Sequence, residues 1–307
     1  MKKVWVVLMG LMLAIGMLAG CAGNTDTNKT IVIYDGQFSE SRIIHQMVKQ
    51  LVEEHTDATV DIRNEMSPVN NYRDLIKGGG SDLMNSYDGT LLTTYLKLDV
   101  SDVPEGKTLY EYANEQANEK EKVHLLEKMG HENTYAIGVP QKLADQYNLN
   151  TISDLAKVAP QLVFGAEHEF FSEEGSMKFG PFAKFYGLNF KESKAIELAL
   201  KYSAVESGNV DVTIVYSTDG MNKKVGLKIL EDDREFFPEY NDALLVRNDL
   251  FERFAETAPN LEEVLNKLGG QFTNEIMTDL TYKVDVEGKT PEEVARGFLT
   301  EKGLIGA

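Results

Sequence analysis

One tyrosine ends a strand-like run at a position suited to ligand contact. Residues 210–216 alternate in character, so that Val212 and Ile214 share one face of a strand and Tyr216 follows them in phase. The sequence Ser-Thr-Asp-Gly comes next, at 217–220, and is typical of a turn. Open α/β sheets bind their ligands at the carboxyl ends of strands, so the aromatic ring of Tyr216 is a candidate ligand contact. The alternative is that Tyr216 only closes the end of the core.

Residue types that catalyse reactions or hold metals are present, but not in the spacing of a known motif. There is no G-x-S-x-G sequence, no phosphate-binding glycine loop and no dinucleotide fingerprint. Cys21 is the only cysteine, which excludes an internal disulfide and a zinc-thiolate site. The histidines are scattered singly, which favours surface or helix-face positions: His45, His55, His124, His131 and His168. We expect no metal and no cofactor, and only an unrecognised carboxylate pair leaves a hydrolase as an alternative.

The first residues resemble a bacterial lipoprotein signal. A basic pair at 2–3 precedes an apolar run over 4–19, which is too short for a membrane-spanning helix. The run ends in Leu-Ala-Gly-Cys, similar to a lipobox whose cysteine becomes lipidated. We therefore expect a signal peptide over 1–21, a lipid on Cys21 and a flexible tether over 22–29. The chain is predicted to be lipid-anchored at the extracytoplasmic face of the cell membrane.

Composition and charge narrow the class of protein further. The 307-residue chain is 42% apolar, which is enough to fill two α/β domains. Its formal net charge is −18, and loss of a leader holding two lysines would make it −20. Such an acidic surface argues against nucleic acid as a partner, and against electrostatic adhesion to anionic lipid.

Strand and helix patterns alternate along the chain, which predicts an α/β fold. Strands are predicted at 30–34, 59–62, 82–87, 134–139, 162–166, 210–216, 227–230 and 243–246. Helices are predicted near 39–52, 108–128 and 196–202, after a cap at Ser153, and after starts at Asn260, Thr273 and Thr290. The last two strands could both return to the first domain.

Four segments resemble, in order and spacing, the substrate-binding lipoproteins of osmoprotectant ABC importers that take up glycine betaine, carnitine and choline. The segments are Tyr87–Thr90, Asn133–Ala136, Tyr216–Gly220 and Phe236–Tyr240, with further matches at Gln37 and 150–155. The resemblance implies a two-lobed periplasmic-binding-protein fold of type II. Lobe I would combine 30–128 with 230–303, and lobe II would span 129–229. It also implies a cage of four tyrosines around a quaternary ammonium, two from each lobe: Tyr87 and Tyr240, Tyr135 and Tyr216.

The same resemblance places Gln37 and Thr90 at the other end of the ligand, where they would bind a carboxylate. The alternatives are an exposed loop position for Gln37 and a helix N-cap for Thr90. Choline-restricted relatives carry Asp at the position of Thr90, so this chain favours betaine-type ligands. Asp88 departs from the family pattern, and would either strengthen cation binding or face water. The arginine that relatives carry after the Glu-Phe of Glu169–Phe171 is missing, which makes choline the second candidate.

The expected protein is a monomeric receptor and not an enzyme. It would capture glycine betaine, carnitine or choline and deliver it to the membrane subunits of an ABC permease. A choline-restricted binding protein and a secreted hydrolase on the same fold are the alternatives.

Overall fold

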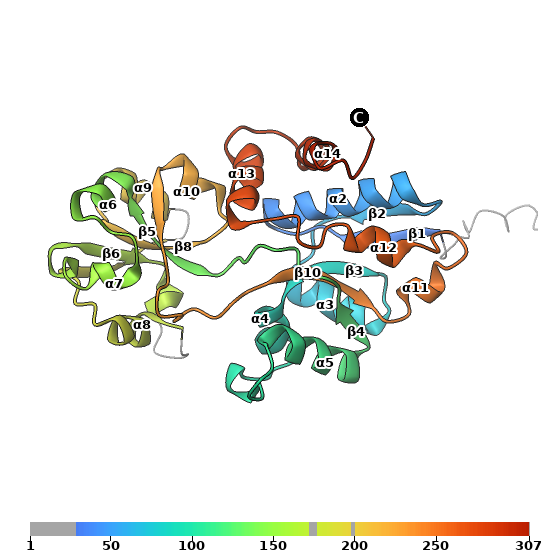
Figure 1. Ribbon diagram of the computed structural model, residues 1–307, viewed down its shortest axis with the longest axis horizontal. Coiled ribbons are helices and arrows are strands. Elements are labelled where there is room, and N and C mark those ends of the chain that lie inside the picture. Colours follow the sequence, from blue (N-terminus) through green and yellow to red (C-terminus); the bar gives the residue numbers. More distant parts are fainter. Residues whose placement is uncertain (1–28, 172–176, 198–199, 307) are drawn as a thin grey trace, which may run out of the picture.

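Two α/β bodies joined by two crossing segments make up the computed structural model, which describes residues 29–171, 177–197 and 200–306 (Figure 1). The predicted signal peptide, Cys21 and the tether up to residue 28 lie outside the described residues. We call the body that carries β1 lobe I and the body that carries β5 lobe II. The alternation of strands and helices expected from the sequence is confirmed, with two corrections. The helix predicted over 108–128 ends at Glu121 and is followed by the strand Val123–Leu125, and the helix predicted over 196–202 lies instead at Lys201–Glu206.

Lobe I holds two small sheets. Its strands are β1 (Thr30–Tyr34), β2 (Thr59–Arg63), β3 (Leu83–Tyr87), β4 (Val123–Leu125) and β10 (Asp242–Arg247). β1 and β2 pair in parallel, while β10 lies between β3 and β4 and is antiparallel to both. The carboxylate of Asp82, directly before β3, accepts a hydrogen bond from the Val32 amide at 2.8 Å, and its own amide donates to the Val32 carbonyl at 2.9 Å. These bonds tie β1 to β3.

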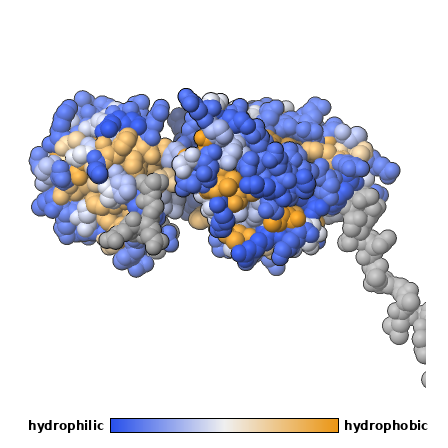
Figure 2. Space-filling view, turned by 90° about the horizontal axis from the view of Figure 1, so that it is seen from below, coloured by the Kyte–Doolittle hydropathy of each residue, from blue (hydrophilic) through white to orange (hydrophobic). Residues whose placement is uncertain are grey.

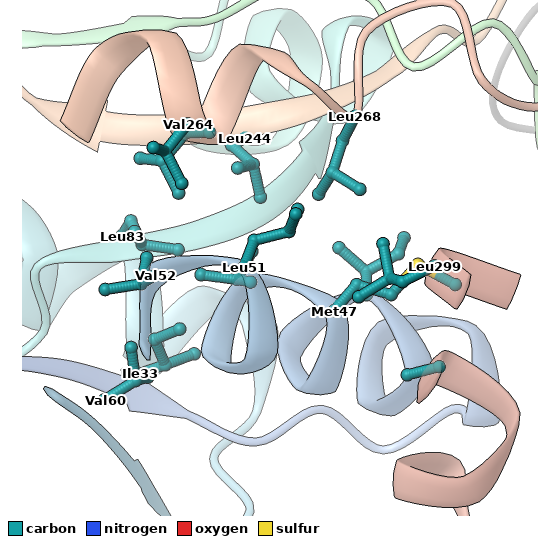
Figure 3. Close-up of a cluster of buried hydrophobic side chains, with 14 of the residues drawn as sticks. Ile33, Met47, Leu51, Val52, Val60, Leu83, Leu244, Val264, Leu268 and Leu299 are labelled. Atoms are coloured by element: carbon teal, nitrogen blue, oxygen red, sulfur yellow. The ribbon is translucent and has the colours of Figure 1, made fainter. Parts of the chain in front are cut away.

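Helices cover the sheets of lobe I, and α2 is the one around which the main core forms. The helices are α2 (Ser39–His55), α3 (Pro68–Lys77), α4 (Asp88–Thr90), α5 (Leu109–Glu121), α11 (Leu250–Arg253), α12 (Leu261–Asn266), α13 (Asn274–Asp285) and α14 (Pro291–Glu301). A π-helical turn, Leu91–Tyr95, follows α4. The apolar stripe of α2 is wholly buried, and in Figure 3 its Met47, Leu51 and Val52 lie between strand residues such as Ile33 and the side chains of the last helices.

Lobe II is built on a five-stranded mixed sheet with the order β7-β6-β8-β5-β9. Its strands are β5 (Tyr135–Pro140), β6 (Val163–Ala166), β7 (Glu192–Ala195), β8 (Val212–Tyr216) and β9 (Leu227–Leu230). Its helices are α6 (Gln141–Tyr147), α7 (Ile152–Leu155), α8 (Phe179–Tyr186), α9 (Lys201–Glu206) and α10 (Gly220–Lys224). β9 pairs with β5 and stays in lobe II, so the expectation that it could return to the first domain is wrong; β10 does return.

Helix starts follow the predicted caps with two exceptions. Thr108 and Thr290 form capping boxes, and Thr273 accepts a hydrogen bond from the Ile276 amide. The helix expected to begin at Ser153 is instead capped by Thr151, whose hydroxyl accepts from the Asp154 amide. Asn260 precedes α12 without a side-chain cap bond.

The two lobes are connected by segments 126–134 and 231–241, which run side by side. The Asn133 amide donates a hydrogen bond to the Tyr240 carbonyl at 3.2 Å, and toward lobe I the Asp242 amide donates to the His131 carbonyl. Toward lobe II the Thr134 hydroxyl donates to the Pro238 carbonyl at 3.2 Å. We call this pair of adjacent segments, 126–134 and 231–241, the hinge.

Helix α13 of lobe I also contacts lobe II. The Thr281 hydroxyl donates to the Thr218 carbonyl at 2.8 Å, and a Cβ at Gly220 would lie 2.4 Å from the Tyr282 amide nitrogen. The close approach of α10 to α13 therefore requires glycine at this position. In Figure 1 the two helices lie next to each other at the junction of the lobes.

The surface is mainly hydrophilic, with apolar patches on both lobes and a waist between them (Figure 2). Within residues 29–171, 177–197 and 200–306, none of the helices combines the length and apolar character needed to cross a membrane.

Candidate ligand-binding site

A cavity of about 650 Å³ lies between the lobes, within the range of ~300–1,000 Å³ of small-molecule sites. Its walls contain five of the six predicted ligand-binding residues: Gln37, Tyr87, Thr90, Tyr216 and Tyr240. Tyr135 is not in the wall, but its ring contacts that of Tyr216. The loop after β1, the end of β3, the end of β8 and the segment before β10 thus meet at one site.

The four tyrosines form two pairs: Tyr87 and Tyr240 both line the cavity, and Tyr216, which also lines it, contacts Tyr135. The ring centroids of Tyr87 and Tyr240 are 6.1 Å apart, with an interplanar angle of 31°. Those of Tyr135 and Tyr216 are 5.5 Å apart at 24°. Tyr135 and Tyr216 are direct register partners on the antiparallel strands β5 and β8, which explains why their rings touch. Burial raises the pKa of the Tyr135 and Tyr216 phenols, so both stay neutral at physiological pH.

The ring of Tyr240 occupies space that only a glycine leaves open. A Cβ on Gly89 would lie 2.1 Å from Cε2 of Tyr240, well inside van der Waals contact. Gly89 follows Tyr87 by two residues, so the chain that carries one tyrosine of the pair also makes room for the other.

Glu40, in the first turn of α2, joins the cavity wall to both the hinge and lobe II. Its carboxylate accepts a hydrogen bond from the Tyr87 phenol, one from the Thr218 hydroxyl at 2.6 Å and one from the Asn133 amide at 3.3 Å. Burial raises the pKa of Glu40, but the contacts with His131, Thr218 and Tyr87 outweigh burial and lower it. Glu40 is therefore a buried, ionised group bonded to a proposed cage residue.

His131 and Asp242 complete a buried ion cluster with Glu40. Nε2 of His131 lies 3.4 Å from a carboxylate oxygen of Asp242 and 3.7 Å from one of Glu40. Burial lowers the pKa of His131, but the two carboxylates raise it to about 10 overall. These are also the described groups whose spacing could hold a metal, and the raised pKa of His131 means that a proton competes with a metal for its imidazole. The expectation of a surface or helix-face position is wrong for His131, which is 1% exposed.

Asp88 does not face water, one of the two alternatives expected for it. The side chain is fully buried, and it accepts hydrogen bonds from the backbone amide of Asn241 at 3.0 Å, from the Asn241 side chain at 2.8 Å and from the Gly89 amide at 2.7 Å. It does not face water and is not in the cavity wall. Asp88 instead fastens the turn after Tyr87 to the second crossing segment.

Gln37 and Thr90 both reach the cavity, from different elements of lobe I. Gln37 is an exposed residue of the loop between β1 and α2. Because it also lines the cavity, the two positions considered for it are compatible. Thr90 lies inside α4 with helical backbone angles and makes no cap bond, so the N-cap alternative is wrong. Residues 172–176, where the family arginine is missing, lie outside the described residues.

The turn after Tyr216 holds that tyrosine in place and meets lobe I. The Ser217 hydroxyl donates to the Glu132 carbonyl at 2.6 Å, and Asp219 caps α10 by accepting from the Met221 amide at 2.9 Å. The Asn222 side chain donates to the Tyr216 carbonyl at 2.8 Å.

Sequence reasoning missed four groups at this site: Glu40, His131, Asp242 and the cavity-lining Lys201. No local motif marks them, because each is far from the others along the chain.

The family model for the substrate-binding domain of ABC-type glycine betaine transport systems matches residues 29–301. The chain belongs to this family. A carnitine transport binding protein of Listeria monocytogenes is 32% identical, with 99% of each chain covered. An ergothioneine transport permease/binding protein of Helicobacter pylori is 29% identical over 92% of this chain, which covers 49% of that protein. A crystal structure of a glycine betaine/carnitine/choline ABC transporter protein superposes with a TM-score of 0.82 at 30% identity, covering 90% of this chain and 99% of that one.

Membership of this family settles the class of protein. The chain is an extracytoplasmic substrate-binding protein of an ABC transport system and not an enzyme, so the hydrolase alternative is excluded. The predicted two-lobed type II periplasmic-binding-protein fold is confirmed.

Proposed function

We propose that this substrate-binding protein captures a quaternary ammonium compatible solute between Tyr87, Tyr135, Tyr216 and Tyr240 and delivers it to an ABC permease for osmoprotectant uptake. The observation that carries the proposal is the arrangement of two tyrosine pairs, one from each lobe, at a single cavity. A ligand that contacts both pairs binds the closed form better than the open one, and so shifts the protein toward closure.

The chemistry of the ligand requires aromatic walls. A trimethylammonium group has no hydrogen to donate, so it is recognised by shape, charge and aromatic faces, each worth ~0.5–2 kcal/mol. Trp5, the only tryptophan, lies in the predicted signal peptide, which leaves tyrosine and phenylalanine for the task. The buried carboxylate of Glu40, bonded to the Tyr87 phenol, adds a fixed negative charge near the cation.

The residues expected to contact the other end of the ligand favour a betaine. Gln37 and Thr90 offer neutral hydrogen-bonding groups in the cavity, and these suit a carboxylate better than an aspartate at Thr90 would. Relatives named for carnitine and ergothioneine transport point the same way, because each of those ligands carries both a trimethylammonium and a carboxylate. We therefore place glycine betaine and carnitine first and a choline-restricted protein second.

The site of action follows from the leader sequence. We propose that Cys21 is lipidated and tethers a monomer to the outer face of the membrane beside its permease. Cys21→Ser should release the protein from the membrane fraction and abolish labelling by a radioactive fatty acid. A variant that stays membrane-bound and labelled would overturn the proposal that Cys21 carries the lipid, but not the proposal about the ligand.

A calorimetric and thermal-shift panel tests the ligand. Glycine betaine, carnitine, choline and proline betaine are compared with glycine, which has the carboxylate but no trimethylammonium. Saturation at 100 times Kd should stabilise the protein by ~2.7 kcal/mol. We expect shifts with the betaines and none with glycine. No response to any quaternary amine would overturn the proposal, and a response to choline alone would establish the second candidate.

A further inference from the structure

Lys201 is the one lysine that is buried among the described residues, with 2% of its surface exposed. It begins α9 in lobe II and lines the cavity. Its Nζ lies 5.4 Å from the ring centroid of Tyr216 and 5.3 Å from that of Tyr202, two other residues of the cavity wall. A positive charge therefore stands beside the proposed cage, on the side contributed by lobe II.

The ammonium of Lys201 lacks an acceptor in the part of the chain that the structure describes, with no hydrogen bond and no carboxylate within 4.0 Å. Asp219 and Glu167 act on it from longer range. A buried ammonium with three free donors is costly unless an acceptor reaches it, and the open side of Lys201 is the cavity. The feature calls for an anion or ordered water at this place.

Burial lowers the pKa of Lys201, and the charges of Glu167 and Asp219 only partly oppose this effect. An anion bound beside Nζ would favour the charged form of the lysine and relieve the cost of its burial.

We infer that Lys201 is an anion subsite of this cavity, and that its ammonium binds the carboxylate of a zwitterionic ligand whose trimethylammonium lies against the tyrosines. The inference rests on the proposed function and deepens it by naming betaines, not choline, as the substrate class. Gln37 and Thr90 reach the cavity from lobe I and Lys201 from lobe II. A carboxylate held by all three would bridge the lobes, as the cation does at its own end.

The test uses two ligands that share a trimethylammonium and differ in the tail. Glycine betaine and choline are titrated calorimetrically into the purified wild-type protein, Lys201→Met, Lys201→Gln and Lys201→Arg. Both neutral variants should bind glycine betaine about 10- to 100-fold more weakly, the range for a lost charged hydrogen bond. Choline affinity should stay within about twofold or improve, because a repulsive cation has gone. Lys201→Arg should keep the preference for betaine.

Lys191→Met provides the matched control, since Lys191 is an exposed lysine of the same lobe and the change in charge is the same. It should alter neither affinity. The unliganded melting temperature of Lys201→Met should not fall, because methionine is easily buried.

Three results would count against the inference or its basis. An equal loss for both ligands, with or without a lower melting temperature, would make Lys201 a structural support for Tyr216 and overturn the inference. A gain for both ligands would make Lys201 a competitor for the cage and would overturn the inference as well. A wild-type protein that binds neither ligand would overturn the proposed function itself.

Discussion

The phenol of Tyr87 donates a hydrogen bond to the carboxylate of Glu40, a residue 47 positions earlier in the chain. Burial and the neighbouring charges of Glu40 and Asp242 raise the pKa of Tyr87 well above its ordinary value. Glu40 in turn keeps a lowered pKa. The Tyr87 ring, which lines the cavity, thus belongs to a neutral phenol that is hydrogen-bonded to an ionised carboxylate.

Replacing Glu40 with Gln should weaken binding of every quaternary amine. Tyr87 and Thr218 donate to different carboxylate oxygens of Glu40, so the single amide oxygen of glutamine can accept from only one of them. The negative charge near the cation is also removed. We expect a loss of about tenfold in affinity, measured by calorimetry with choline and glycine betaine. The unliganded protein should also melt earlier, because His131 loses one of its two carboxylates.

Glu54→Gln is the control for this experiment, because Glu54 is an exposed residue of the same helix. It should leave both affinity and melting temperature nearly unchanged. Equal affinities of Glu40→Gln and the wild type would show that the charge of Glu40 does not act on the ligand.

Removing the ring of Tyr216 separates ligand contact from core closure. Tyr216→Ala should lower affinity for quaternary amines by about 2- to 30-fold, the value of one aromatic face, and change the unliganded melting temperature little. Tyr216→Phe keeps the ring and should retain most of the affinity. Fluorescence or calorimetric titration measures the first effect and circular dichroism melting the second. Unfolding of the alanine variant would instead support the alternative that Tyr216 only closes the end of the core.

A single methyl group on Gly89 should displace Tyr240. Because the added Cβ would lie 2.1 Å from the ring, Gly89→Ala forces Tyr240 out of its place and should reduce affinity by at least about tenfold. Gly297→Ala on α14 is the matched control, since a Cβ there meets nothing within 4 Å. It should leave binding intact and stabilise the protein by up to ~1 kcal/mol. Unchanged binding by Gly89→Ala would remove Tyr240 from the cage.

The raised pKa of Asp88 makes the stability of the folded protein depend on pH, and the sign of this dependence follows from the direction of the shift. Burial raises its pKa from 3.8 to about 6, against the hydrogen bonds from Asn241 and Gly89 that lower it. The folded protein therefore binds more protons than the unfolded chain between those values, and this group's contribution to the free energy of unfolding falls as pH rises through the window. Asp88→Asn cannot ionise, so its stability relative to wild type should increase by up to ~3 kcal/mol between about pH 4 and pH 7.

Denaturant unfolding at several pH values measures this difference. Asp99→Asn should show the opposite sign, because hydrogen bonds from Ser101 lower the pKa of the exposed Asp99. A stability difference for Asp88→Asn that stays constant with pH would contradict the argument.

Local patterns were enough to predict much of the fold. The apolar stripe of α2, the alternation that ends at Tyr216 and the caps at Thr108 and Thr290 each depend on residues within a few positions of one another. The partner of β9 was not predictable in this way, because a strand's pairing depends on where the chain returns in space.

The candidate site was predictable only where the resemblance named its residues. Five of the six predicted residues line one cavity. The distances between the predicted residues depend on long-range strand pairing, such as that of Tyr135 with Tyr216, which are 81 residues apart in the sequence. The ion cluster of Glu40, His131 and Asp242 was missed for the same reason, and a solitary histidine in a sequence gave no sign of it.

The two crossing segments have a mechanical consequence. Tyr135 directly follows the first segment and Tyr240 lies at the end of the second, so both rings sit beside the axis about which the lobes would turn. In a rigid rotation each atom travels in proportion to its distance from the axis. A ligand that shifts these rings slightly would swing the far rims of the lobes through a much longer arc. Under the proposed function, a small movement of the tyrosines at the bound solute would thus become a large displacement of the outer surfaces of the lobes, where a permease could detect it.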